Sequence, residues 1–318
     1  MPPADRVAGP LKTGLSLPTW PLRDGSYASW PEMRRLAQRI EALGVDTLWV
    51  PDHLQRRTLG RGVFGFWECW TILTAAAEAT STIEVGPFIA CTGFRNPGLL
   101  AKMAATLDEV SGGRLVLGLG SGVPARDLSW SAFGFDGTRH VGRYAEAVEI
   151  TARLLRDGEL TFEGAQHRID DARIIPRGPR DGAIPVVVAG LGERTAAVGA
   201  RFGDQLNVNR AIASAADAAE VMAIAARACG AVGRDAATLD VTGWARLAIG
   251  EDGIAVDRPG ALAGDPATVA ATVTEIAATG IRHLTFYPGA ADDPSPLPAL
   301  THPTLEAFAP FLEAIRAA

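Results

Sequence analysis

The chain has 318 residues, of which 47% are hydrophobic and 21% are charged, and its formal net charge is −6. Such a composition is typical of a water-soluble globular protein, and no apolar run approaches the roughly 20 residues of a membrane span. The basic residues are scattered along the sequence and form no stripe, which argues against nucleic acid as a partner.

The cysteines and histidines form no metal-binding or disulfide pattern. Cys69, Cys91 and Cys229 are far apart, and no two histidines show the H-E-x-x-H or a comparable spacing, so we expect neither a structural zinc nor a catalytic metal. The first ten residues, MPPADRVAGP, lack a basic cluster followed by an apolar core. We therefore expect a reduced protein located in the cytoplasm.

Apolar runs typical of strands alternate with segments of helical period along the chain. The predicted strands are residues 11–18, 46–50, 83–91, 114–120, 185–189, 205–209, 239–249 and 281–287. The predicted helices follow at about 30–43, 68–79, 97–110, 142–156, 193–201, 215–229, 266–278 and 303–317. Eight βα units without a linker or a shift in composition predict one α/β domain over residues 1–318, a (β/α)8 TIM barrel rather than an open sheet.

Two local patterns refine this prediction. In GDPATVAATV, Asp265 can cap a helix whose first turn accommodates Pro266. The segment LTFEGAQHRI, residues 160–169, indicates a small hairpin inserted before the fifth barrel strand.

Four motifs follow predicted strands and should meet at one end of the barrel. They are Asp52-His53 after the second strand, PFIACTGFRNP across the end of the third, GLGSG at the end of the fourth and AGLGERT after the fifth. Function in a TIM barrel gathers at the carboxyl ends of the strands. We therefore expect these motifs to line one mouth.

The Asp52-His53 pair is the candidate catalytic group. An imidazole can carry a proton near neutral pH or orient a ring, and Asp52 is expected to fix the tautomer of His53. A loop histidine that is simply hydrogen-bonded to backbone remains the alternative.

The glycine-bearing turn VVVAGLGERT is a candidate anion site. Gly190, Leu191 and Gly192 could hold a phosphate on backbone amides at a helix start, assisted by Arg194 or Thr195. A tight βα turn without a ligand is equally compatible with the spacing.

Two other enzyme classes are disfavoured by the motifs. GLGSG lacks the G-x-G-x-x-G spacing, which argues against an NAD-type Rossmann site. The chain has no G-x-S-x-G motif and no evident base for Ser121, which argues against a serine hydrolase.

Aromatic residues concentrate in the loops after the first, second and fourth strands, where they could wall an apolar cleft. We expect some of them to pack under the loops and others to contact a small apolar or aromatic substrate. The candidates for substrate contact are Trp20, Trp67, Trp130 and Phe133, and their neighbours are Phe64, Phe66 and Phe135.

Four segments together resemble the luciferase-like monooxygenase superfamily. They are LGVDTLWVPDHL, IEVGPFIACTGFRNPGLLAKMAATLDEVSGGRLVLGLGSG, AGLGERTAAVGARFGDQLNVN and GDPATVAATVTEIAATGIRHLTFYPG, which cover nearly the whole chain. The resemblance implies a (β/α)8 barrel with an added segment before the fifth strand. It also implies either FMN, used reduced for oxygen chemistry, or the deazaflavin coenzyme F420, used for hydride transfer.

The resemblance assigns roles to individual residues. His53, supported by Asp52, would lie beside the reactive face of the cofactor ring. The Phe88–Ile89 junction matches a non-prolyl cis peptide bond that relatives place behind the ring. The other residues implied are Thr92, Ser121 and Gly122 along the cofactor, and Gly190, Leu191, Gly192 and Thr195 at its phosphate.

Two departures from the family pattern bear on the cofactor and the substrate. An acid-histidine pair in place of the paired histidines of FMN-using luciferases favours F420. Val123 and Pro124 stand where F420-dependent sugar-phosphate dehydrogenases place a catalytic glutamate, which disfavours a sugar phosphate.

The expected function is therefore F420-dependent hydride transfer. Reduced-FMN-dependent monooxygenation with O2 is the alternative, and a barrel that has lost its chemistry is a third hypothesis. The resemblance also allows a separate flavin or F420 reductase as a partner, and a homodimer.

Overall fold

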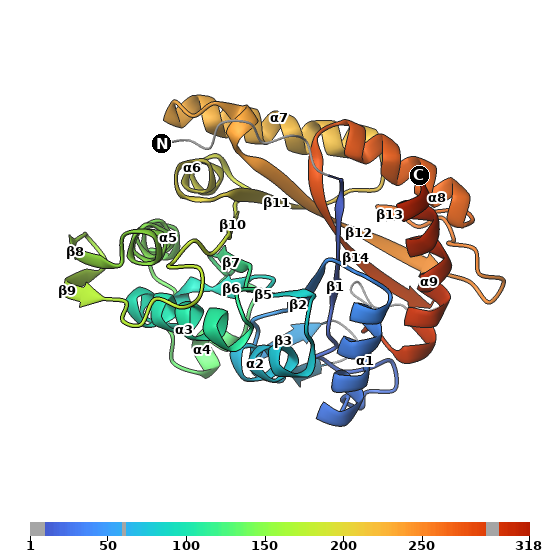
Figure 1. Ribbon diagram of the computed structural model, residues 1–318, viewed down its shortest axis with the longest axis horizontal. Coiled ribbons are helices and arrows are strands. Elements are labelled where there is room, and N and C mark those ends of the chain that lie inside the picture. Colours follow the sequence, from blue (N-terminus) through green and yellow to red (C-terminus); the bar gives the residue numbers. More distant parts are fainter. Residues whose placement is uncertain (1–9, 59–61, 291–298) are drawn as a thin grey trace.

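A ring of parallel strands forms the centre of the protein (Figure 1). The computed structural model describes residues 10–58, 62–290 and 299–318. The strands of the ring are β1 (Lys12–Ser16), β2 (Thr47–Val50), β5 (Glu84–Pro87), β7 (Leu117–Gly120), β10 (Val186–Ala189), β11 (Gln205–Ala211), β12 (Asp240–Ile249) and β14 (Ile281–Ala290).

The ring closes at both of its critical junctions. Strand β14 pairs with β1 in parallel, with Leu15 opposite Phe286, so the last strand meets the first. Between the third and fourth positions, β5 meets the residues just before β7 through the parallel bridge from Val85 to Leu115. This closure confirms the predicted (β/α)8 barrel.

A helix follows each strand of the ring and covers its outer face (Figure 1). Leu, Ile, Val and Ala side chains from the strands and helices form one buried core between the two layers. The helices are α1 (Trp30–Ala42), α2 (Cys69–Ala79), α3 (Pro97–Val110), α5 (His140–Asp157), α6 (Glu193–Phe202), α7 (Ala215–Val232), α8 (Pro266–Ala278) and α9 (His302–Ala317).

The predicted helix start at Asp265 is confirmed. The carboxylate of Asp265 accepts a hydrogen bond of 2.8 Å from the amide of Thr268, and Pro266 is the first residue of α8. None of the helices in the described ranges is long and apolar enough to cross a lipid bilayer.

The third predicted strand is interrupted. The peptide bond between Phe88 and Ile89 is cis, as the family resemblance predicted. The chain then resumes pairing as β6 (Ala90–Cys91), which lies beside β7 with Ala90 opposite Leu119. One continuous strand over residues 83–91 was therefore a wrong prediction.

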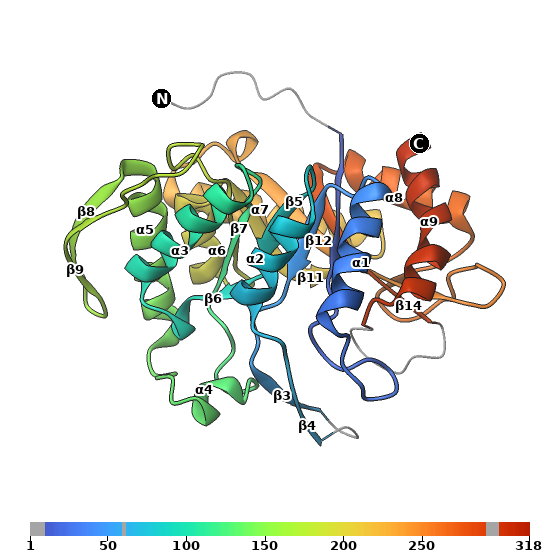
Figure 2. The ribbon, with the colours of Figure 1, turned by 60° about the horizontal axis from the view of Figure 1, so that its bottom comes forward.

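The predicted hairpin before the fifth strand is present as β8 (Glu159–Glu163) and β9 (Arg168–Arg173), which lie outside α5 (Figure 2). Several short elements were not predicted from the sequence. They are β3 (Gln55–Thr58), β4 (Gly62–Gly65), β13 (Ala261–Leu262), the short helix α4 (Ser129–Ala132) and the 3-10 turns at Thr92–Phe94 and Ala236–Thr238.

Trp49 fills the interior of the barrel. Its side chain is buried against Phe88, at 5.0 Å between ring centroids, and against His283, at 5.4 Å. A Cβ atom on Gly14 or on Gly86 would fall 2.4 or 2.6 Å from its ring, so the two glycines make room for the indole. The barrel interior is therefore packed by side chains near this level.

Candidate functional site

The site is built from loops at the carboxyl end of the ring. The β3–β4 hairpin, which follows β2, and α4, which follows β7, extend from the same end of the barrel (Figure 2). The Asp52-His53 segment precedes the hairpin and residues 121–128 precede α4. Two loops that are separated along the chain therefore meet at the mouth.

His53 is held by a carboxylate that sequence analysis missed. Its Nδ1 atom lies 2.6 Å from Oδ2 of Asp127, and the imidazole is 34% exposed whereas the Asp127 side chain is 7% exposed. The other carboxylate oxygen of Asp127 accepts a hydrogen bond of 2.9 Å from the amide of Ser129. Both oxygens of Asp127 are therefore engaged.

The state of this pair follows from its surroundings. Burial opposes ionisation of Asp127, but the hydrogen bonds from His53 and Ser129 outweigh burial and lower the pKa of the carboxyl. The ionised carboxylate can only accept, so Nδ1 of His53 must carry the hydrogen. This arrangement leaves Nε2 of His53 to bind or exchange a proton.

Ser129 fixes the backbone that carries the histidine. Its hydroxyl oxygen accepts hydrogen bonds from the amides of Leu54, at 3.1 Å, and Gln55, at 3.0 Å. Because Ser129 also donates its amide to Asp127, one short segment holds both the imidazole and its backbone.

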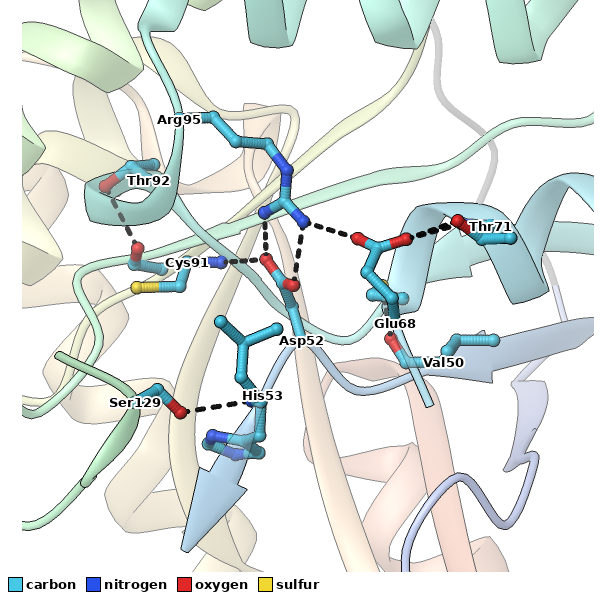
Figure 3. A network of polar contacts seen from close by, with 12 residues as sticks. Val50, Asp52, His53, Glu68, Thr71, Cys91, Thr92, Arg95 and Ser129 are labelled. Atoms are coloured by element: carbon cyan, nitrogen blue, oxygen red, sulfur yellow. Dashed lines mark hydrogen bonds and ion pairs between the residues drawn. The ribbon is translucent and has the colours of Figure 1, made fainter. Parts of the chain in front are cut away.

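Asp52 does not contact His53, so the predicted tautomer role of Asp52 is wrong. Figure 3 shows its carboxylate directed toward Arg95, on the opposite side of the chain from the imidazole. Neighbouring side chains of an extended segment point to opposite sides, which explains the divergence. The fully buried carboxylate accepts hydrogen bonds of 2.5 and 3.1 Å from Arg95 and one of 2.9 Å from the amide of Cys91.

The Asp52–Arg95 ion pair joins three segments of the mouth. Burial raises the pKa of Asp52, and the Arg95 guanidinium acts against this rise. Arg95 also binds Glu68 at 2.8 Å, and Glu68 caps α2 by accepting from the amide of Thr71. The pair therefore ties the end of β2 to the starts of α2 and α3 (Figure 3).

Aromatic side chains line one flank of His53. The ring of Phe66 lies 5.2 Å from the imidazole, between centroids, and Phe66 in turn packs against Trp20 and Phe64 at 6.3 and 5.6 Å. This flank confirms that aromatic residues after the first and second strands gather near the mouth.

The four residues predicted to contact substrate lie in different settings. Trp67 and Phe133 are 46% and 54% exposed, so they are accessible to a ligand. Trp20 is buried beside Phe66, and Trp130 is buried against Phe94 at 5.4 Å. A buried indole offers little surface to a substrate, so the structure does not support the predicted contact for Trp20 or for Trp130.

The residues predicted to line the cofactor gather where β6 and β7 end. The hydroxyl of Thr92 donates to the carbonyl of Gly120 at 3.1 Å, and Ser121 donates to the carbonyl of Gly122 at 3.0 Å. Gly122 has a φ of +64°, and a Cβ there would lie 2.7 Å from Sγ of Cys91. Only glycine fits at this turn without displacing its neighbours.

The turn predicted to hold a phosphate is partly closed by the chain itself. The amide of Gly190 donates to the carbonyl of Asn207 at 2.8 Å, and the amide of Gly192 donates to the hydroxyl of Thr195 at 3.1 Å. Leu191, Gly192 and Arg194 are exposed at the start of α6. An anion would therefore meet the first turn of α6, not the amide of Gly190.

No cluster of three or more His, Cys, Asp or Glu side chains suited to a metal occurs within residues 10–58, 62–290 and 299–318. The polar groups at the mouth instead form the His53–Asp127 pair and the Asp52–Arg95–Glu68 network.

Comparisons with known proteins agree with this architecture. A family model described as luciferase-like monooxygenase matches residues 12–259. An F420-dependent secondary alcohol dehydrogenase, solved with an F420-acetone adduct, superposes with a TM-score of 0.76 at 18% identity, over 97% of this chain and all of that chain. At that identity the superposition shows the shared fold.

Two curated relatives match this chain over part of their own length. An F420-dependent glucose-6-phosphate dehydrogenase from Intrasporangium calvum is 34% identical over 170 residues, 52% of this chain and 50% of the relative. An F420-dependent hydroxymycolic acid dehydrogenase from Mycobacterium tuberculosis is 30% identical over 224 residues, 68% of this chain and 58% of the relative. The match thus spans between half and three fifths of these relatives.

Proposed function

Because the chain belongs to the luciferase-like monooxygenase family, we propose that it is an oxidoreductase that transfers a hydride between coenzyme F420 and a small organic substrate. The two relatives described above are both named as F420-dependent dehydrogenases, which supports this choice of cofactor. The supporting observation within this chain is the imidazole of His53 held on the carboxylate of Asp127.

His53 is suited to the proton that accompanies hydride transfer. When bound, a deazaflavin supplies a two-electron ring that passes hydride and reacts little with oxygen. With Nδ1 bonded to Asp127, Nε2 of His53 can donate a proton to a developing alkoxide, or accept one from an alcohol. The Asp127 carboxylate stabilises the charged imidazolium in either direction.

The chain has features that fit such a cofactor. The close turn at Gly122 lies just beyond the end of β7, at the mouth, where the ring would bind. The first turn of α6 exposes Gly192 and Arg194, and Arg194 makes no ion pair within the described ranges. Residues 191–195 would hold the phosphate there through amides and the positive end of the helix dipole.

A substrate with apolar or aromatic character fits the exposed aromatic side chains at the mouth. Trp67 and Phe133 offer such surfaces. The loop after β7 has Val123 and Pro124 at the positions that disfavour a sugar phosphate, and its carboxylate comes later, at Asp127, where it is committed to His53.

Reduced FMN acting with O2 is the second candidate. Oxygen chemistry on a flavin requires exclusion of water from the ring, and the packed rings of Trp20, Phe64 and Phe66 beside His53 could contribute to that exclusion.

Cofactor binding tests the proposal directly. Purified protein is titrated into F420 and into FMN while the fluorescence of each cofactor is followed. We expect F420 to bind with a Kd of about micromolar order and FMN to bind at least about tenfold more weakly. Tight FMN binding without F420 binding would favour the second candidate and overturn the first.

A pair of glycine variants tests the phosphate site. In Gly190→Ala the new Cβ would lie 2.4 to 2.5 Å from backbone atoms of Thr195 and Ala196, so the first turn of α6 must shift. In the control Gly192→Ala the nearest atom is 3.9 Å away. Gly190→Ala should weaken F420 binding by about tenfold with little change in kcat, and Gly192→Ala by less than about twofold. Equal losses of folded protein without loss of affinity would support the plain turn.

A further inference from the structure

A cavity of about 360 Å³ is lined by residues of β3, of α4 and of the loop that precedes α4. These elements extend from the mouth of the barrel (Figure 2). Its volume falls within the range of about 300 to 1,000 Å³ that is usual for small-molecule sites. The lining residues are Arg57, Pro124, Ala125, Arg126, Asp127, Leu128 and Ser131.

Two guanidinium groups of this cavity have no counter-ion among residues 10–58, 62–290 and 299–318. Arg57 and Arg126 are exposed, and neither makes an ion pair or a side-chain hydrogen bond with another residue of the described ranges. Among the other arginines, the half-buried Arg39 and Arg143 and the exposed Arg173 and Arg210 are each paired with a carboxylate. Unpaired guanidinium groups that face one cavity are suited to bind an oxyanion through parallel hydrogen bonds.

Asp127 does not neutralise these arginines. Its two carboxylate oxygens are committed to His53 and to the amide of Ser129, and its side chain is nearly buried. Two cations thus face the cavity against one carboxylate that is already satisfied, so the lining is net positive although the chain has a net charge of −6. A positive concave surface on an acidic protein attracts anions locally.

The remainder of the lining sets the shape of the ligand. Pro124, Ala125 and Leu128 contribute apolar surface, and Ser131 adds a hydroxyl. A free inorganic ion would leave this apolar surface in water. An organic anion with an apolar body uses both parts of the cavity.

We propose that this cavity binds the anionic group of the substrate, so that the substrate is an organic carboxylate or phosphate monoester with an apolar body. This inference rests on the proposed function in one respect, because Asp127 belongs both to the cavity and to the pair that holds His53. Because Asp127 lines the cavity and contacts His53, an anion held by Arg57 and Arg126 would be separated from the imidazole by the Asp127 side chain. The two arginines thereby orient the reacting part of the molecule.

Binding of three matched probes tests the inference without any cofactor. The probes are phenylacetate, phenyl phosphate and the neutral phenylacetamide, titrated by calorimetry into wild type, into the double variant Arg57→Gln/Arg126→Gln and into the control Arg56→Gln. Arg56 is the neighbouring strand residue, also without a partner in the described ranges, and it does not line the cavity. Circular dichroism and thermal unfolding establish that all variants are folded.

We expect at least one anion to bind wild type about tenfold or more tightly than phenylacetamide, and the double variant to lose that preference. Arg56→Gln should retain the preference within about twofold, because its charge lies outside the cavity. The choice between phenylacetate and phenyl phosphate identifies the acid.

Three outcomes would overturn the inference. They are equal binding of all three probes to wild type, an unchanged preference in the double variant, and an equal loss in Arg56→Gln. F420 binding is measured separately on the same proteins. Anion preference without F420 binding would support the cavity and refute the proposed function, whereas F420 binding without anion preference would do the reverse.

Discussion

His53 and His283 belong to the same barrel but lie in opposite surroundings. His53 lies at the mouth, is 34% exposed and has a carboxylate 2.6 Å from Nδ1. His283 lies inside the ring against Trp49, and burial lowers its pKa to about 4. An imidazole with a carboxylate partner and access to solvent can exchange protons, whereas a buried one is kept neutral and serves packing.

This difference is more informative than the residue type itself. His53 follows the barrel strand β2 and His283 lies within β14, and a sequence motif alone would rank them by neighbouring residues. The structure separates them by solvent access and by partner, which are the properties that general acid–base chemistry requires. Variants of each histidine should therefore change different measurements.

His53→Ala should have the largest effect on turnover. Removing a general acid or base costs about 100- to 10,000-fold in rate, so F420-dependent turnover should fall by that order. The fold should be retained, and the free energy of unfolding should fall by about 1 to 3 kcal/mol, because the nearly buried carboxylate of Asp127 loses one hydrogen-bond partner. Steady-state kinetics and urea unfolding measure the two quantities. A rate within about twofold of wild type would remove His53 from the mechanism.

His283 should affect the pH dependence of stability. Its pKa is about 4 in the folded protein and near the ordinary value of 6.5 in the unfolded chain. Below the unfolded pKa, the unfolded chain takes up a proton that the folded imidazole does not. The contribution of His283 to the free energy of unfolding should therefore be fully present above about pH 6.5. About 3 kcal/mol of stability should be lost as the pH falls to about 4.

Urea unfolding of wild type and His283→Gln across this pH range measures the effect of His283. The variant should lose less stability than wild type on acidification. If the variant does not fold, NMR of wild type provides a second test, since the His283 imidazole should still be neutral at about pH 5. A protonated ring at that pH, or parallel stability curves for the two proteins, would contradict the prediction.

Asp127→Asn should have the smallest of these effects, about 10- to 100-fold in kcat, which is typical for loss of a group that orients a functional histidine. The asparagine amide can donate to Nδ1 of His53 and so favour the wrong tautomer. We expect the loss mainly in kcat, a changed pH profile of the rate and partial rescue by Asp127→Glu. Nitrogen chemical shifts of the imidazole report the tautomer directly.

Asp52→Asn is the matched control for Asp127→Asn. Asp52 pairs with Arg95 and does not contact His53, so its loss should lower stability without changing the tautomer. Identical pH profiles in the two variants would show that Asp127 has only a structural role.

The barrel was predictable because its signals are local. Each apolar strand run and each helical segment has its own period, and helix starts such as Asp265–Pro266 identify the boundaries. The β3–β4 hairpin was missed because Gln55 to Thr58 is a polar run without alternation of apolar residues. That the whole chain forms one domain stays a prediction.

The partners at the site were not predictable in the same way. Adjacency in sequence suggested that Asp52 supports His53, but the carboxylate that does so is 74 positions away, in a loop after another strand. No periodicity links residues over that distance. The available signal was the presence of two polar residues, Asp127 and Ser129, after the glycines of the fourth strand. Only closure of the barrel brings these residues to the loop that carries His53.

The Ser129 hydroxyl also limits which changes this loop can accept, because it binds the amides of Leu54 and Gln55. Residues 124–131 supply the cavity wall, the carboxylate that holds His53 and the hydroxyl that anchors the backbone, all in one contiguous segment. Replacing this segment with a loop from another protein, in order to bind a new compound, would displace the imidazole of His53 unless Asp127 and Ser129 were retained. Substrate selectivity and proton transfer therefore depend on the same segment, and substitutions there change both.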